Sequence, residues 1–252
     1  MSNHQNPKFM KTKIFPVILV LFLFAGMSGL FAGCHFPGSI SGDGKIIKET
    51  RSVPSFDGID ISGAFDVSLK QGDTQEVIIE TDDNVMPLVK TEVTGGVLKI
   101  YTQGPIHHIT TMKAYITVKE LRKIEVSGAV DLETTGRITV PELKIDASGS
   151  SDSKMEISVS RLYLDCSGAS KFSFSGNAGD VKLDLSGASD IFAYDLLVEN
   201  YEMEISGAGK AKINVSKRLR AEISGAGTVL YRGTPTEIDQ NISGAGSIKK
   251  GD

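Results

Sequence analysis

The chain has 252 residues, with 31 acidic side chains against 27 basic ones and a formal net charge of −4. A mildly acidic chain without a basic cluster is a poor partner for the phosphate backbone of nucleic acids, so we expect no nucleic-acid ligand. The partners left open are a membrane, a protein or a glycan.

The first 33 residues have the pattern of a secretory signal peptide. Lys11 and Lys13 precede an apolar run over residues 14–24, and small residues follow up to Gly33. A basic start, a short apolar stretch and small residues before a cleavage point are the three parts of such a signal. The apolar run is too short to span a bilayer comfortably. We therefore expect residues 1–33 to be removed from the mature protein.

Cys34 is the expected point of membrane attachment. It follows Leu30-Phe31-Ala32-Gly33, which resembles the bacterial lipobox, a motif whose cysteine is acylated after cleavage. Two or three acyl chains, at roughly 0.8 kcal/mol per buried methylene, anchor a protein stably. Residues 34–54 would then be a lipidated tether to the outer membrane of the cell envelope. An ordinary secretory signal with a chance cysteine is the alternative.

The orientation of the anchored protein stays open in the sequence. Residues 35–38, directly after Cys34, lack the acidic run that resembles a surface-export tag in lipoproteins of this type. Periplasmic and surface-facing display are therefore equally expected. With Cys34 lipidated, Cys166 has no partner for an intramolecular disulfide.

Residues 55–121 are expected to form an irregular β-layer. Four segments alternate apolar and polar residues at the period of a half-buried strand. They are residues 64–69, 76–80, 96–101 and 113–118. Because terminal repeats need caps to stay soluble, we expect this layer to start and to cap a repeat structure in the residues that follow.

The strongest signal is an internal repeat, which fills residues 122–252. The tripeptide Ser-Gly-Ala occurs seven times in the chain, and Ser148-Gly149-Ser150 nearly matches it. The seven copies begin at Ser62, Ser127, Ser167, Ser186, Ser206, Ser224 and Ser243. From Ser127 onward, with Ser148 included, the turns follow one another at intervals of 18 to 21 residues. A near-constant period of this kind indicates a stacked solenoid.

Each repeat holds two short strands and two corners. Apolar and polar residues alternate before each Ser-Gly-Ala, as in Leu162-Tyr163-Leu164-Asp165-Cys166, and a second alternating run follows the turn. Glycine suits the corner because a tight reversal usually needs a positive φ. Equivalent strands of successive coils would pair in parallel about 4.8 Å apart. The sequence therefore predicts an all-β fold, a parallel β-helix with two sheets and about 19 residues per coil.

The alternation sorts the side chains before the turn into rows. The inward row is expected to hold Val126, Ala147, Cys166, Leu185, Ile205, Ile223 and Ile242. A thiol in such a row acts as a small hydrophobe, so Cys166 is expected to be structural. The outward row is expected to hold Glu125, Asp146, Asp165, Asp184, Glu204 and Glu222, with Asn241 at its end.

The six acids of the outward row are the candidate binding face. Stacked like charges repel one another, and basic residues two positions earlier, such as Lys144 and Lys182, would neutralise them in part. A solvated face that blunts edge association is one interpretation. A carboxylate ladder that binds a divalent cation or a basic ligand is the other. The aspartate-bearing glycine nonapeptides of calcium-binding β-helices do not occur in the sequence, so we expect no calcium site.

Several of these segments resemble one known family. The stretch Phe-Asp-Gly-Ile-Asp-Ile-Ser-Gly-Ala-Phe-Asp-Val over residues 56–67 and the later turns are similar to the head GIN domain of auto-transporter adhesins, which is common in lipoproteins of Bacteroidetes. The resemblance covers about residues 55–245. It implies a right-handed β-helix related to pectin-lyase-like folds and a role in cell adhesion. It also suggests trimers; the sequence shows no coiled-coil stalk, so a homo-oligomer stays open.

Two classes of function fit these features. The first is a non-enzymatic adhesion or surface-presentation module of the cell envelope. The second is a pectin-lyase-like protein that binds or cleaves a polysaccharide, for which Tyr163 is the best outward aromatic platform. Cleavage needs paired carboxylates or a base in a groove formed by long loops, and coils of 18 to 21 residues leave almost no room for them. We therefore expect no enzyme, and no catalytic, cofactor or metal site.

Overall fold

A computed structural model of the chain describes residues 39–251. They belong to a compact unit that begins at Pro37. The signal peptide expected over residues 1–33 and the lipid site expected at Cys34 lie outside the described residues.

The elements of the described part are β1 (Ile46–Thr50), β2 (Gly58–Gln71), β3 (Glu76–Asp82), the 3-10 helix η1 (Met86–Leu88), β4 (Val89–Thr94), β5 (Val97–Thr102), β6 (Met112–Val118), β7 (Lys123–Gly149), β8 (Asp152–Gly168), β9 (Lys171–Gly187), β10 (Asp190–Gly207), β11 (Lys210–Gly225), β12 (Thr228–Arg232), β13 (Glu237–Gly244) and β14 (Ser247–Lys250). Over residues 39–251, no helix has the length and apolar character needed to cross a membrane.

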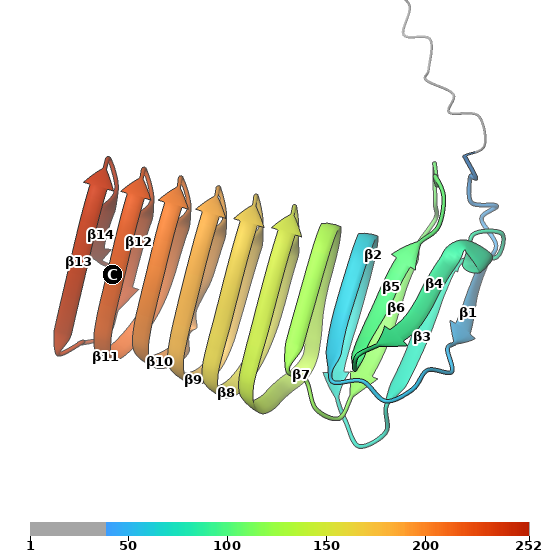
Figure 1. Ribbon diagram of the computed structural model, residues 1–252, viewed down its shortest axis with the longest axis horizontal. Helices are drawn as coiled ribbons and strands as arrows, with labels where there is room; N and C mark the ends of the chain where they lie inside the picture. The colour runs from blue at the N-terminus through green and yellow to red at the C-terminus, as the bar shows by residue number, and fades with distance from the viewer. Residues whose placement is uncertain (1–38, 252) are drawn as a thin grey trace, which may run out of the picture. The chain divides into compact units, whose positions relative to one another are not determined.

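The central strands form a β-solenoid. They stack in parallel in the order β2-β7-β8-β9-β10-β11. The segments that lead into the Ser-Gly-Ala turns form the front layer in Figure 1, and the segments that follow the turns form the back layer. The turns are in strict register, since Ser148 pairs with Ser167, Ser167 with Ser186, and Ser186 with Ser206. The predicted all-β solenoid with about 19 residues per coil is therefore confirmed.

The Ser-Gly-Ala corner admits only glycine at its centre. At Gly225 the backbone has a φ of +130°, a conformation that is strained for any residue with a Cβ atom. A Cβ at that position would also lie 2.6 Å from the carbonyl oxygen of Gly207 in the preceding coil. The next residue, Ala226, donates its amide to the same oxygen at 2.8 Å. Backbone geometry and coil-to-coil contact thus explain why the motif recurs at every turn.

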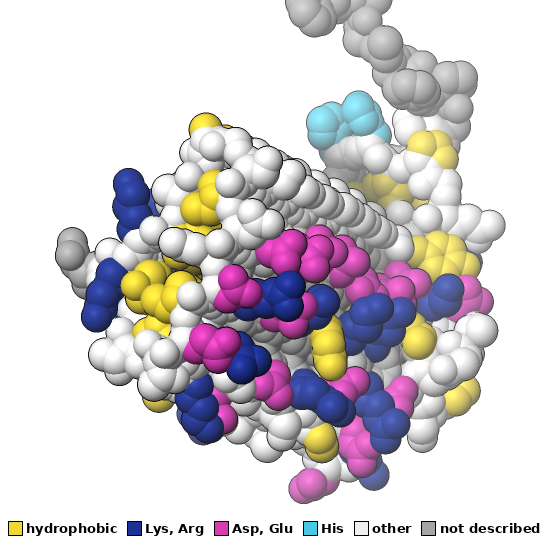
Figure 2. Space-filling model, turned by 60° about the vertical axis from the view of Figure 1, so that its left-hand side comes forward, with side chains coloured by type: hydrophobic (Ala, Val, Ile, Leu, Met, Phe, Trp, Pro, Cys, Tyr) yellow, Lys and Arg dark blue, Asp and Glu magenta, His cyan; other side chains and the backbone are white. Residues whose placement is uncertain are grey.

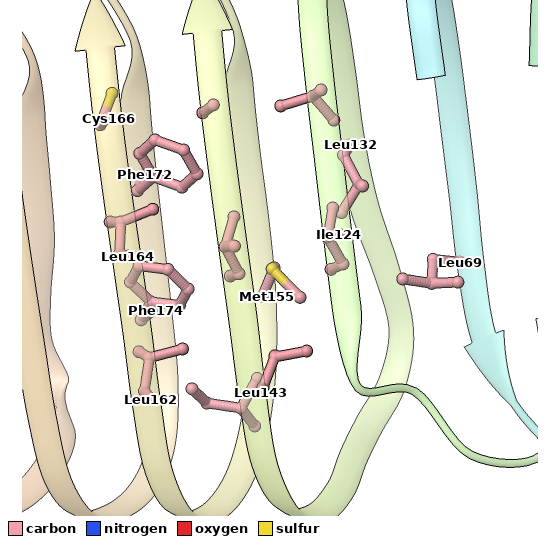
Figure 3. Packing of buried hydrophobic residues seen from close by; sticks show 14 of the residues in the cluster. Leu69, Ile124, Leu132, Leu143, Met155, Leu162, Leu164, Cys166, Phe172 and Phe174 are labelled. Carbon is pink, nitrogen blue, oxygen red and sulfur yellow. The ribbon is translucent and has the colours of Figure 1, made fainter. Parts of the chain in front are cut away.

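The core is a set of apolar rows that run along the solenoid between the two layers. Figure 3 shows Leu162, Leu164 and Cys166 in line on one strand, with Phe172 and Phe174 of the next strand facing them. The rings of the two phenylalanines are stacked with their centroids 5.8 Å apart. Six residues expected in the inward row before the turn are buried: Val126, Ala147, Cys166, Leu185, Ile205 and Ile223.

The seventh member of that expected row is not buried. Ile242 is 39% exposed and Ile238, on the same strand β13, is 43% exposed. β13 pairs with β11 along one edge, and no described strand pairs with its other edge. The expectation that Ile242 faces a closed core is therefore wrong, because burial in a solenoid needs a coil on both sides.

The N-terminal layer changes from parallel to antiparallel pairing. β5 and β6 pair in parallel with the two halves of β2, whereas β3 is antiparallel to β6, β1 to β3 and β4 to β5. The first Ser-Gly-Ala, at Ser62, is in register with the one at Ser127 despite the residues inserted between them. The stack of turns therefore begins at β2.

A buried carboxylate fastens the first described segment to this layer. Asp82, at the end of β3, is 0% exposed. Its oxygens accept hydrogen bonds from the amide of Gly44 at 2.7 Å and from the amide and hydroxyl of Thr110, both at 2.8 Å. Burial alone would raise the pKa of Asp82, but these hydrogen bonds outweigh it and hold the pKa below its usual value.

Candidate binding faces

The expected acidic row forms on the outer surface of the front layer. Strand pairing places Asp146, Asp165, Asp184, Glu204 and Glu222 in register on successive coils. Figure 2 shows Asp and Glu side chains gathered in a band along this face, beside a band of Lys and Arg. The arrangement is a ladder of carboxylates at the spacing of β-strands, about 4.8 Å.

The row also extends one coil further than the sequence analysis placed it. Glu125, its first expected member, pairs in register with Asp60 of β2. Asp60 stands two residues before Ser62, as each acid of the row stands before its own turn. That spacing was the available signal, but the irregular segment between the first two turns concealed it.

Basic side chains neutralise the two ends of the row. Lys123 lies 2.8 Å from Glu125 and 3.6 Å from Asp146, and Arg220 lies 3.0 Å from Glu222. The hydrogen bond that Lys123 donates to Glu125 is the largest of the effects that raise the pKa of Lys123, and the hydrogen bond that Arg220 donates to Glu222 is the largest of those that raise the pKa of Arg220.

The middle of the row lacks such partners. The position two residues before each acid, which holds the basic residue at the ends of the row, holds Tyr163 on β8 and Glu202 on β10. Glu202 forms an ion pair with the ammonium of Lys182 at 3.1 Å. As a result, the carboxylates of Asp165, Asp184 and Glu204 form no ion pair and no side-chain hydrogen bond in the described part of the chain, although Lys182 attracts those of Asp184 and Glu204 from a longer distance. These three carboxylates are the part of the expected face that is free to meet a basic ligand.

A shallow hollow lies beside the carboxylate ladder. It has a volume of about 720 Å³, and its lining includes Tyr163, Lys182, Arg161 and Asp180. Tyr163, the outward aromatic expected from the sequence, is half-buried in this lining. Over residues 39–251 no three His, Cys, Asp or Glu side chains are grouped so that they could hold a metal ion. The hollow offers a polar ligand the charged side chains of its lining and the aromatic ring of Tyr163.

The back layer carries a second cluster that the sequence analysis missed. Phe192 and Tyr194 of β10 point outward and are half-buried, with three cations over their rings. The ammonium of Lys212 lies 5.4 Å from the ring centre of Phe192, and the guanidinium of Arg232 lies 4.0 Å from that of Tyr194. The signal was the alternation from Asp190 onward, which puts both aromatic side chains on the outer face.

Comparison with known proteins gives one family and several solved structures. The family model described as "Putative auto-transporter adhesin, head GIN domain" matches residues 55–235. The comparison with curated proteins finds no match.

The solved structures share the fold along their whole length. A crystal structure of a putative adhesin from Bacteroides fragilis superposes with a TM-score of 0.79 at 23% identity, covering 84% of this chain and 100% of its own. A putative adhesin from Parabacteroides distasonis gives a TM-score of 0.69 at 25% identity, with 84% and 100% coverage. A crystal structure named as a putative lipid-binding protein from the same species gives 0.68 at 24% identity, with 85% and 100% coverage.

Proposed function

The chain belongs to the family of putative auto-transporter adhesin head GIN domains, and from this premise we propose that it is a non-enzymatic adhesion module, held at the cell envelope by a lipid on Cys34. The family and its structural neighbours are named as adhesins, which favours binding over catalysis. The finer parts of the proposal are the lipid anchor, the outer membrane as its location and the surface used for attachment.

One observation carries the proposal. The solenoid presents straight rows of side chains on coils that are joined by short corners, as at Ser-Gly-Ala. A catalytic groove in a solenoid needs long loops to enclose it and to exclude water, whereas attachment needs an extended and rigid surface. The rows of the front layer, with Asp165, Asp184 and Glu204 unpaired, supply such a surface.

The anchor is tested by labelling cells that express the full chain with a palmitate analogue. We expect the label in the wild-type protein and none in Cys34→Ser. Cys166→Ser is the matched control, because Cys166 is buried in the core and should leave labelling unchanged. Label retained in Cys34→Ser would contradict the anchor.

The adhesion role is tested on intact cells. Protease added outside should remove the protein, and cells lacking it should attach less to host or neighbouring bacterial cells. A protein that survives on intact cells and is digested only after lysis faces the periplasm, and that result would overturn the adhesion proposal. Unchanged attachment after deletion would overturn it as well.

A further inference from the structure

The cluster on the back layer has the form of a slot that is one strand wide. Its floor is β9, where the outward residues are Ser173 and Ser175. One wall is Lys154 of β8, which pairs in register with Ser173, and the other is Phe192 and Tyr194 of β10. The hollow between them has a volume of about 430 Å³.

The width of the slot follows from the strand spacing. β8 and β10 both pair with β9, so their backbones are about 9.5 Å apart. Two serines leave the floor low, whereas a lysine and two aromatic rings raise the walls. The space left between walls of that height suits one flat, ring-sized group that lies against the aromatic side chains.

A bulge in β10 builds the aromatic wall. Between Phe192 and Asp195 the strand has one residue more than β9 has opposite it, and the register shifts there. The extra length keeps Ala193 buried in the core while Tyr194 and Asp195 both reach the outer surface. Bulges often re-aim side chains next to binding sites. Here the bulge puts a second ring and a carboxylate beside Phe192.

Two charges at the slot have no ion-pair partner among the described residues, the cation of Lys212 and the carboxylate of Asp195. Lys171 and Lys212 lie 5.7 and 5.4 Å from the ring centre of Phe192. Lys171 has Asp152 at 3.5 Å and Lys154 has Glu133 at 3.1 Å. Lys212 forms no ion pair with any residue in the described part of the chain, so its charge is available to a ligand. An anionic group is the natural partner of such a cation.

We propose that this slot binds one acidic sugar residue of a glycan. The apolar C–H face of a sugar ring would stack on Phe192 and Tyr194, and its hydroxyl edge would meet Ser173, Ser175 and Asp195. Its acidic group would pair with Lys212. Asp195 accepts hydrogen bonds from sugar hydroxyls but repels a densely charged polyanion, so a singly charged sugar fits the slot better than polyphosphate or nucleic acid.

The proposal deepens the adhesion role by naming a ligand class, and it rests on that role only for its biological setting. It is tested on the purified compact unit from Pro37 onward by titration calorimetry. The matched probes are a β-1,4-linked mannuronate hexamer and mannohexaose, which share ring and linkage and differ in the carboxylate. We expect the mannuronate to bind and mannohexaose to bind about tenfold more weakly or not at all.

Two of the single changes, Phe192→Ser and Ser173→Phe, copy the residue that the neighbouring coil carries in register. Tyr194→Ser changes a half-buried outward side chain in the bulge, so the double variant Phe192→Ser with Tyr194→Ser should keep the fold, and we expect its mannuronate binding to fall by about tenfold or more. Ser173→Phe should block the slot while both rings stay in place. Lys212→Gln should remove the preference for mannuronate over mannohexaose. Leu197→Ser, at an exposed side chain of β10 that does not line the slot, is the control and should leave the binding of both hexamers unchanged.

Several results would overturn the proposal. They are no binding of either hexamer, equal binding of both, or mannuronate binding that survives the double serine variant and Ser173→Phe. Equal or tighter binding of polyphosphate or of oligo(dT), unaffected by the same variants, would show a nonspecific anion surface in place of a sugar site. None of these outcomes bears on the experiments with intact cells, so the two proposals fail separately.

Discussion

The thiol of Cys166 lies 3.1 Å from the hydroxyl of Ser189, one coil further along, and both side chains are buried. The pair belongs to a rule that later coils obey with other residues. Where the inward row holds Ile205 or Ile223, the position that faces it in the next coil is Gly227 or Gly246. A Cβ on Gly227 would lie 2.8 Å from Cγ2 of Ile205. In these later coils Ile205 and Ile223 therefore face glycine, whereas the smaller thiol of Cys166 leaves room for a serine.

Gly227→Ser is the first test of this rule. We expect it to destabilise the solenoid by about 1–3 kcal/mol through overpacking against Ile205. Combining it with Ile205→Cys recreates the Cys166–Ser189 pair, so the double variant should be more stable than the sum of the two single changes predicts. Urea unfolding of the four proteins measures the coupling. Strict additivity would show that the two positions do not touch.

Gly225→Ala should destabilise the protein by about 2 kcal/mol or more. The added methyl group would need a strained φ and would meet the carbonyl oxygen of Gly207. Ala226→Ser is the matched control, because Ser150 already occupies the equivalent place in another turn. Melting temperatures decide: a Gly225→Ala protein as stable as the control would remove the physical basis given for the repeated turn.

The buried carboxylate of Asp82 predicts a pH dependence. Its folded pKa lies below the unfolded value of ~3.9. The carboxylate therefore stabilises the fold at neutral pH, and that contribution is lost as the pH falls through the folded pKa. We expect Asp82→Asn to be less stable than wild type at pH 7, with the difference shrinking in strong acid.

Unfolding curves of both proteins across this pH range make the comparison. Asp83→Asn is the control, since Asp83 holds only an exposed ion pair with Lys45, and such pairs contribute little. A wild-type advantage over Asp82→Asn that is the same at every pH would show that the charge of Asp82 does not matter.

The middle of the acidic row should gain stability when one charge is removed. Asp184 stands in register between Asp165 and Glu204 and has no cation bound to it among the described residues. Asp184→Asn is expected to stabilise the isolated unit by roughly 0.2–1 kcal/mol at low salt, and less at high salt. Thermal melts at the two salt concentrations measure it. A loss of stability would mean that Asp184 already has a partner.

The sequence predicted the parts of the fold that depend on local pattern. Alternation and the glycine period are properties of each coil, so the rows of Cys166 and Asp165 could be assigned from the sequence alone. The slot could not be assigned in the same way, because Lys154, Ser173 and Phe192 are brought together only by register, and the bulge at Tyr194 shifts that register. Ile242 was misplaced because its pattern is the same as that of Ile223, and only the missing neighbour exposes it.

The register between Ser62 and Ser127 has a consequence for the order of folding. The coils from β7 onward close over about 19 residues each, so they can form one after another as the chain grows. β5 and β6 can pair with one edge of β2 as soon as they are made, but the other edge must wait until β7 exists. During synthesis from the N-terminus, residues 58–71 are therefore made early and keep one edge unpaired until β7 follows. That open edge is exposed to mispairing during this interval.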